Sequence, residues 1–265
     1  MAQYETILFE EPEADAIAKI TLNRPDTHNA FNAQMIEELT DVFDRLAGMD
    51  EARLAVLKGA GKSFSAGADL TWMKAAASYS RVQNEADAIK LAAMLRKLHD
   101  LPQATLAMVQ GAAMGGGAGL VAACDVVVSM ASTKFRFSEV RLGLTPATIS
   151  PFVIKAIGPR WAKALFVTAE SFDAPYAEKM GLVHYTAQND EEMAMLQEHV
   201  TGLVLAAAPE AIHDSKKLVD DFAGQEITDA IGEETARRIA ARRASDEGRE
   251  GLTAFLEKRK PNWNA

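Results

Sequence analysis

The chain has 265 residues, of which 48% are hydrophobic and 25% charged, enough for one large globular domain or one domain with a small appendage. The formal net charge is -9, and because proteins that bind a phosphate backbone usually carry an excess of basic residues, this charge argues against nucleic acid as a main partner. The single cysteine, Cys124, allows no intramolecular disulfide and fits a reducing compartment.

The sequence shows no recognisable membrane or export signal. The N-terminus lacks a basic segment followed by an apolar one and is typical of a strand beside acidic residues. No apolar run approaches the ~20 residues that cross a bilayer. We therefore expect a cytoplasmic protein that does not use a membrane as its partner.

Strand-like and helix-like segments alternate in the first part of the chain. Residues 17–22 alternate between apolar and polar, as in a half-buried strand. A helix that ends near residue 48 follows, with four apolar residues on one face: Ile36, Leu39, Phe43 and Leu46. Residues 54–57 then form a short apolar strand. This alternation predicts an α/β core.

Two glycine-rich turns follow strands in this core. Residues 64–69, which we name the first glycine turn, follow the strand at 54–57. A helix over about 82–99 and a strand at 105–109 come next. Residues 115–117, the second glycine turn, then open a short helix. A further strand is predicted at 126–128.

After Glu139 helical patterns dominate to the end of the chain. We expect an α/β core over residues 1–190 and a helical region over residues 191–265. No linker rich in serine or glycine separates the two regions. The helices are therefore expected to pack on the core or on a neighbouring subunit.

The glycine turns indicate chemistry on a carbonyl or thioester. Glycine lets a backbone turn tightly and aim free N–H groups at one oxygen, which is how an oxyanion hole is built. The alternative is that both turns are purely structural. A phosphate loop is excluded because Val56 stands where the motif needs a glycine before Gly61-Lys62-Ser63. The five histidines lack metal-ligand spacing, so we expect no metal site.

Longer motifs resemble a known family over essentially the whole chain. They are both glycine turns, the segment Phe137–Leu144, the opening Asn23-Arg24-Pro25, the pair Cys124-Asp125 and the basic tail at 254–260. Together they resemble the enoyl-CoA hydratase/isomerase (crotonase) superfamily. The resemblance implies a crotonase-like spiral of repeated strand–strand–helix units, with a helical C-terminal region that mediates trimerisation and allows trimers to pair into hexamers.

The resemblance also implies roles for particular residues. The backbone N–H groups of Ala68 and Gly116 would hold the thioester oxygen, and Glu139 would be the acid/base. Eight further residues would bind substrate or CoA: Arg24, Lys62, Ala66, Asp69, Trp72, Gly119, Phe255 and Lys258. Asp69 is alternatively a helix cap, Trp72 a packing residue, and the tail residues a solvated helix end. Coenzyme A belongs to the substrate, and no separate cofactor is implied.

Gly119 departs from the pattern of the typical hydratases, which carry a second glutamate at this position. Two carboxylates suit hydration, whereas a single carboxylate suits movement of a double bond, so the departure favours isomerisation. A finer similarity, over residues 64–73 and 138–158, points to bacterial methylglutaconyl-CoA and carboxygeranoyl-CoA hydratases. On that hypothesis Gly119 makes room for a branched or carboxylated acyl group, and Arg141 is a candidate partner for its carboxylate, with a surface ion pair as the alternative.

The sequence thus predicts an acyl-CoA lyase that hydrates a branched or carboxylated enoyl-CoA. An enoyl-CoA isomerase that uses Glu139 alone is the first alternative. A relative that binds acyl-CoA or RNA without catalysis is the second, but Glu139 and the two turns argue against binding alone, and the net charge argues against RNA.

Overall fold

The computed structural model describes residues 4–264, and it divides into two compact units, one that ends at His199 and one that spans Val200–Ala265. The sequence predicts a division at residue 190, at the start of α7 (Asp190–Ala206), whereas the compact units divide inside that helix. Each unit is described below by itself.

The first unit is built on a six-stranded sheet. Strand β1 pairs with β2 in antiparallel register, and the other neighbours are parallel. In spatial order the strands are β1 (Ile7–Glu10), β2 (Ile17–Leu22), β3 (Leu54–Gly59), β4 (Ala104–Val109), β6 (Val126–Met130) and β9 (Tyr185–Ala187).

A second, smaller sheet creates the repeated unit. It contains β5 (Ala112–Met114), β7 (Lys134–Arg136) and β8 (Phe172–Asp173). The chain passes from β4 of the large sheet to β5 of the small one and then into α4 (Gly116–Ala123). It repeats this path through β6, β7 and α5 (Ser150–Thr168), which breaks at Gly158 because that glycine is not helical and a proline follows it. The expected strand–strand–helix repeat and the α/β class are confirmed.

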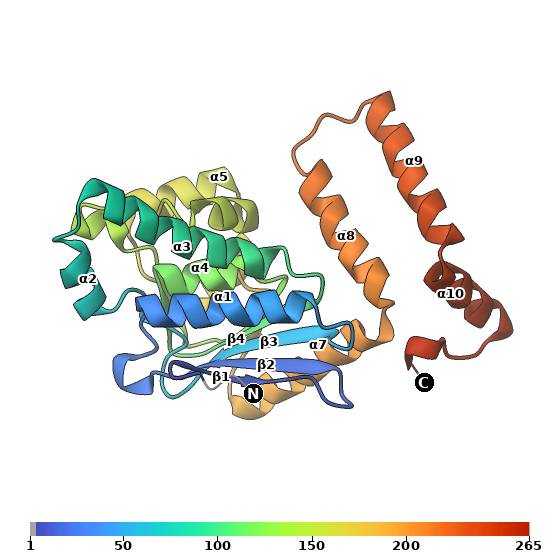
Figure 1. Ribbon diagram of the computed structural model, residues 1–265, viewed down its shortest axis with the longest axis horizontal. Helices are drawn as coiled ribbons and strands as arrows, with labels where there is room; N and C mark the ends of the chain where they lie inside the picture. The colour runs from blue at the N-terminus through green and yellow to red at the C-terminus, as the bar shows by residue number, and fades with distance from the viewer. Residues whose placement is uncertain (1–3, 265) are drawn as a thin grey trace. The chain divides into compact units, whose positions relative to one another are not determined.

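Helices cover the large sheet, and the first of them follows its sequence pattern. The helix α1 (Ala33–Ala47) begins at Asn32, whose side chain accepts the N–H of Met35, and it buries the four apolar residues predicted to face the core. It lies beside α3 (Arg81–His99) over the sheet (Figure 1). In α3, Leu95 and Leu98 are buried as expected, but Ile89 is exposed. The remaining helical segments of the unit are η1 (Pro25–Thr27), α2 (Leu70–Ala76), η2 (Glu139–Leu142) and α6 (Ala174–Met180).

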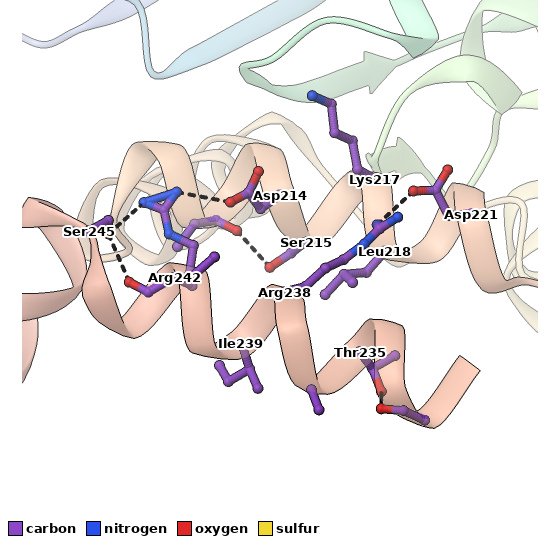
Figure 2. Close-up of a pocket in the computed structure, with 14 residues that line it drawn as sticks. Asp214, Ser215, Lys217, Leu218, Asp221, Thr235, Arg238, Ile239, Arg242 and Ser245 are labelled. Carbon is purple, nitrogen blue, oxygen red and sulfur yellow. Dashed lines mark hydrogen bonds and ion pairs between the residues drawn. The ribbon is translucent and has the colours of Figure 1, made fainter. Parts of the chain in front are cut away.

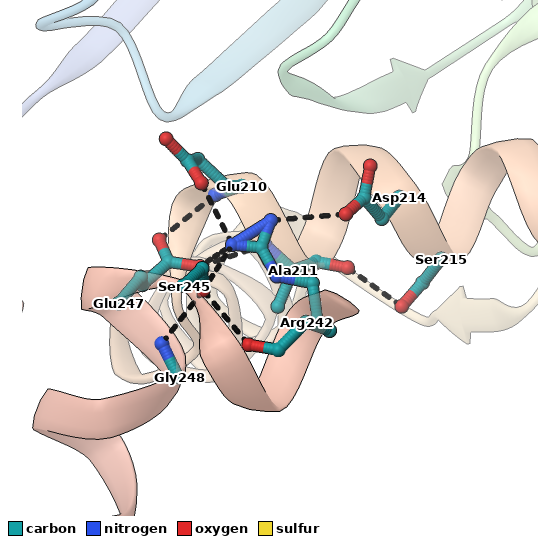
Figure 3. A network of polar contacts seen from close by, with 8 residues as sticks. All are labelled: Glu210, Ala211, Asp214, Ser215, Arg242, Ser245, Glu247 and Gly248. Carbon is teal, nitrogen blue, oxygen red and sulfur yellow. Dashed lines mark hydrogen bonds and ion pairs between the residues drawn. The ribbon is translucent and has the colours of Figure 1, made fainter. Parts of the chain in front are cut away.

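The second unit is helical. Its elements after α7 are α8 (Pro209–Phe222), α9 (Asp229–Ala244), α10 (Asp246–Glu257) and η3 (Asn262–Asn264). Arg242, near the end of α9, donates to Asp214 at 2.9 Å, Glu210 at 2.7 Å and Glu247 at 3.1 Å (Figure 3). Glu247 in turn accepts the N–H groups of Glu210 and Ala211 at the start of α8. One arginine therefore ties three helices together.

Within residues 4–264, no helix has both the length and the apolar character that a membrane span requires.

Candidate active site

The first glycine turn leaves the N–H of Ala68 without an acceptor. Phe31 forms a parallel bridge with this residue: its N–H donates to Gly67 O at 2.6 Å, and its carbonyl accepts the N–H of Asp69 at 2.8 Å. Because successive residues of an extended segment direct their N–H groups to opposite sides, the N–H of Ala68 points away from Phe31. No hydrogen-bond partner for it occurs in the part of the chain that the structure describes.

Asp69 and Arg24 hold this turn in place. The carboxylate of Asp69 caps α2 by accepting the N–H groups of Thr71 at 2.7 Å and Trp72 at 3.3 Å. Its other oxygen pairs with Arg24 at 2.9 Å, and Arg24 also donates to the carbonyl of Ala30. Burial alone would raise the pKa of Asp69, but the bonds from Arg24, Thr71 and Trp72 outweigh it and lower that pKa. Arg24, expected to bind CoA, thus already has a carboxylate partner.

The second glycine turn leaves the N–H of Gly116 without an acceptor. Gly115 adopts φ +49°, and its own N–H donates to Arg136 O at 2.9 Å. Gly116 is the first residue of α4, and the bond from Gly119 N–H to Gly115 O closes the first turn of that helix. The N–H of Gly116 is therefore one of the free donors at the start of the helix, since no carbonyl of the helix lies before it to accept it. No partner for it is found within residues 4–264.

The fold brings the two turns side by side. Ser65 bridges to Ala113, and its carbonyl accepts the N–H of Met114 at 2.9 Å. A Cβ on Gly67 would lie 3.0 Å from the carbonyl oxygen of Met114, and one on Gly116 would lie 2.8 Å from the ring of Phe31. Glycine is therefore required at Gly67 by its positive φ and the neighbouring backbone, and at Gly116 by the ring of Phe31.

Glu139 lies against the second turn. It opens η2, and its Oε1 lies 3.3 Å from the position that a Cβ on Gly115 would take. Burial raises the pKa of its carboxyl group, and Oε2 is buried without a hydrogen-bond partner among the described residues. A half-buried carboxyl that holds its proton more tightly than usual, beside backbone donors, is suited to proton transfer.

The hypothesis that Gly119 makes room for a bulky acyl group is wrong. A Cβ on Gly119 would overlap the side chain of Ile149, which is buried, and would lie 3.8 Å from Leu95. The space beside Gly119 is filled by protein. Glycine is needed here because α4 and the start of α5 pack closely, which the sequence alone could not reveal.

The other predicted binding residues occupy varied environments. Lys62 and Ala66 are exposed, and Trp72 is half-buried with an indole N–H that has no hydrogen-bond partner in the described chain. Phe255, 80% exposed, and Lys258, which caps the C-terminus of α10, belong to the second unit. Their role in CoA binding stays a prediction.

Two residues without a role predicted from the sequence lie next to predicted site residues: the carbonyl of Arg136 accepts the N–H of Gly115, which precedes Gly116, and Ile149 packs against Gly119. Arg136 lies between Phe135 and Phe137, which are both buried. Alternation of this kind is typical of a strand, and it predicts that Arg136 faces the side of the sheet opposite to the two phenylalanines. No sequence pattern indicates that Ile149 packs against Gly119.

The second unit has a cavity of its own, of about 990 Å³, between α8 and α9 (Figure 2). Apolar residues such as Leu218 and Ile239 line it, and two of its arginines are paired with acids, Arg238 with Asp221 at 2.6 Å and Arg242 with Asp214 at 2.9 Å. Because both of its acids are paired with its arginines, we assign it no catalytic role.

Comparison with known proteins agrees with this geometry. The family model described as enoyl-CoA hydratase/isomerase matches residues 12–265. The chain is 31% identical to the crotonyl-CoA hydratase of Syntrophomonas wolfei, over 98% of each chain. It is 30% identical to the short-chain-enoyl-CoA hydratase of Clostridium acetobutylicum, over 92% of each chain. The crystal structure of an enoyl-CoA hydratase from Shewanella pealeana superposes with a TM-score of 0.93 at 38% identity, covering 98% of this chain and 97% of that one.

Proposed function

We propose that this chain, which belongs to the enoyl-CoA hydratase/isomerase family, adds water across the α,β double bond of an enoyl-CoA thioester. One observation carries the proposal: two glycine turns lie side by side, each with an unused backbone N–H, and a buried carboxyl lies against one of them. This arrangement provides an oxyanion hole and an acid/base in one place.

In the proposed reaction the N–H groups of Ala68 and Gly116 bind the thioester oxygen. Water gives a proton to the Glu139 carboxylate while its oxygen bonds to Cβ, and the π electrons move to the thioester oxygen as an enolate. Glu139 then gives the proton to Cα and the carbonyl re-forms, so the sum is one water added. Each backbone donor can lower the barrier by ~3 kcal/mol, and the positive end of α4 adds to this stabilisation.

We further propose that the preferred substrate is branched or carboxylated. The support is the similarity of residues 64–73 and 138–158 to methylglutaconyl-CoA and carboxygeranoyl-CoA hydratases. The space expected beside Gly119 gives no support, because Ile149 fills it. Lys62, Phe255 and Lys258 are the proposed contacts to CoA, and the second unit is proposed to assemble the chain into trimers. The thioester itself accepts the electrons, so no further cofactor enters the proposal.

Isomerisation is the second candidate, and a specific observation favours it. The position of the second carboxylate is Gly119, and Ile149 fills the space beside it. With Glu139 as the acid/base, one carboxyl could carry a proton between Cα and Cγ without water entering the product.

Product analysis by mass spectrometry separates the two reactions. The full chain would be incubated in heavy-oxygen water with crotonyl-CoA, 3-methylglutaconyl-CoA and a 3-enoyl-CoA in parallel. A labelled hydroxyl in the product is the result expected. A shifted double bond without label would show isomerisation and refute the hydratase proposal. No turnover of any of the three substrates would refute both proposals.

A further inference from the structure

Arg136 lies on the strand that borders the second glycine turn. It pairs in register with Met114, and its carbonyl accepts the N–H of Gly115, the residue before the donor Gly116. The neighbouring register pair, Ala113 with Phe135, is fully buried. Because side chains alternate along a strand, Arg136 and Met114 project from the opposite face, away from that core.

The guanidinium of Arg136 has no partner in the described chain. Its Nε is buried and lacks a hydrogen-bond acceptor, and no acidic side chain within residues 4–264 forms an ion pair with it. Arg24 and Arg45, also partly buried, are both paired with carboxylates. An unsatisfied buried donor costs about 1–3 kcal/mol, so the buried Nε of Arg136 calls for an acceptor that the described chain does not supply.

A second unsatisfied donor belongs to the helix that follows the first glycine turn. The indole N–H of Trp72, in the helix that the first glycine turn opens, is also buried without a partner in the part of the chain described. Arg136 adjoins the second turn through its carbonyl, and Trp72 lies in the first turn of the helix that follows the first glycine turn. Next to each turn there is therefore a residue with an unpartnered side-chain donor, besides the free backbone N–H of the turn itself.

The geometry points to Arg136 as the residue that binds a carboxylate on the acyl group of the substrate, an inference that rests on the proposed function and names its substrate class. Arginine presents a planar fork of donors that matches a carboxylate. Through Gly115 the arginine is tied to the thioester end of the site, beside Glu139, whereas the CoA phosphates lie beyond the long pantetheine arm. This position favours an acyl carboxylate over a phosphate.

The rival residue is Arg141, which the sequence analysis named as a candidate partner of such a carboxylate. It lies in η2 two residues after Glu139 and is exposed to solvent. An exposed arginine is stable in water without an anion, and its interaction with one is weak. The structure therefore shifts the assignment from Arg141 to Arg136.

The test compares binding of two unreactive ligands by calorimetry, 3-methylglutaryl-CoA and isovaleryl-CoA, which share the branch but not the carboxylate. We expect wild-type protein to bind the acidic ligand more tightly. Arg136→Met should lower the affinity for the acidic ligand by at least about tenfold, as expected for loss of a charged hydrogen bond. The affinity for the neutral ligand should change less than twofold. Arg136→Lys should restore part of the difference, and Arg141→Met and the exposed Arg160→Met should leave both affinities unchanged.

Several results would overturn the assignment: equal loss for both ligands, no loss for either, selective loss in Arg141→Met, or no preference in the wild type. Should Arg136→Met fail to fold, Arg136→Lys and Arg136→Gln give the same comparison. The hydratase proposal is tested separately by turnover of crotonyl-CoA. Turnover without a carboxylate effect would refute only this inference, and a carboxylate effect without turnover would refute only the hydratase.

Discussion

At the scale of single residues, Glu139 combines burial with an unsatisfied oxygen. Glu139→Gln keeps the shape of the side chain but removes its titratable proton. We expect kcat to fall by about 10²–10⁴, the usual contribution of general acid–base catalysis, while affinity for a saturated acyl-CoA stays within a few fold. Steady-state kinetics and calorimetry would check this. Parallel loss of binding would instead indicate a structural role.

The same substitution predicts a pH-dependent change in stability. Because the folded state raises the pKa of Glu139 above its ordinary value of 4.5, the folded protein binds the proton more tightly than the unfolded chain does. The free energy of unfolding of the wild type therefore falls as pH rises from below 4.5 through the raised pKa. Glu139→Gln lacks this loss, so its stability relative to wild type should increase across that range in urea titrations. A difference independent of pH would contradict the assignment.

Gly119 gives a second test at this scale. Gly119→Ala places a Cβ against Ile149 and should cost about 1–3 kcal/mol in the free energy of unfolding. The matched control is Gly232→Ala in α9, where nothing lies within 4 Å of the added Cβ and the change should be neutral or stabilising. Gly119→Ala should cost less in an Ile149→Ala background than in the wild type, which a double-mutant cycle would measure. Equal stability of both alanine variants, measured in urea, would refute the close packing.

The residues of the site differ in how far the sequence reveals them. The glycine turns and the family motifs are local patterns, and they identify Ala68, Gly116 and Glu139 as candidates from the sequence alone. The filling of the Gly119 site by Ile149 and the unpaired state of Arg136 depend on segments distant in sequence, so no local pattern encodes them.

At the scale of elements, the start of α2 positions the proposed donor of Ala68. Asp69→Ala removes the helix cap and leaves Arg24 unpaired, so it should cost about 1–2 kcal/mol and lower kcat/KM, because the N–H of Ala68 loses its fixed direction. Asp69→Asn retains the capping oxygen and should be milder. Equal activity of Asp69→Ala and wild type would show that the helix cap does not contribute to catalysis.

Acid should reduce the contribution of Asp69. Its folded-state pKa is lowered, so the stability it provides is present above its ordinary value of 3.8 and is lost as pH falls through the lowered pKa. The difference in the free energy of unfolding between wild type and Asp69→Asn should therefore shrink in that acidic range.

Long periodic elements were predicted well, and short ones were not. The strand at Ile17–Leu22 has the predicted bounds, and the apolar face of α1 is buried as expected. The strands β5, β7, β8 and β9 have two or three residues each and were not predicted, because so short a segment shows no period. One of them, β5, nevertheless places the second glycine turn beside the first, through the bridge between Ser65 and Ala113.

At the scale of the whole molecule, Arg242 is central to the second unit. Its side chain is 19% exposed and contacts three acids. Arg242→Met should cost about 1–3 kcal/mol and weaken hydrogen-exchange protection across α8, α9 and α10 together, since breaking a partly buried pair leaves charges unpaired. Arg237→Met, on the same helix but 65% exposed, is the control and should have little effect. Similar protection in both variants would contradict a central role.

Each scale contributes to one claim, that Glu139 and two backbone N–H groups form and collapse an enolate on a CoA thioester. The most direct test is exchange of the Cα proton of butanoyl-CoA against D₂O, followed by mass spectrometry, because it requires neither hydration nor isomerisation. We predict that the wild type incorporates deuterium at Cα and that Glu139→Gln binds the ligand without exchanging it. Equal exchange by both proteins, or none by a wild type that binds the ligand, would contradict the claim.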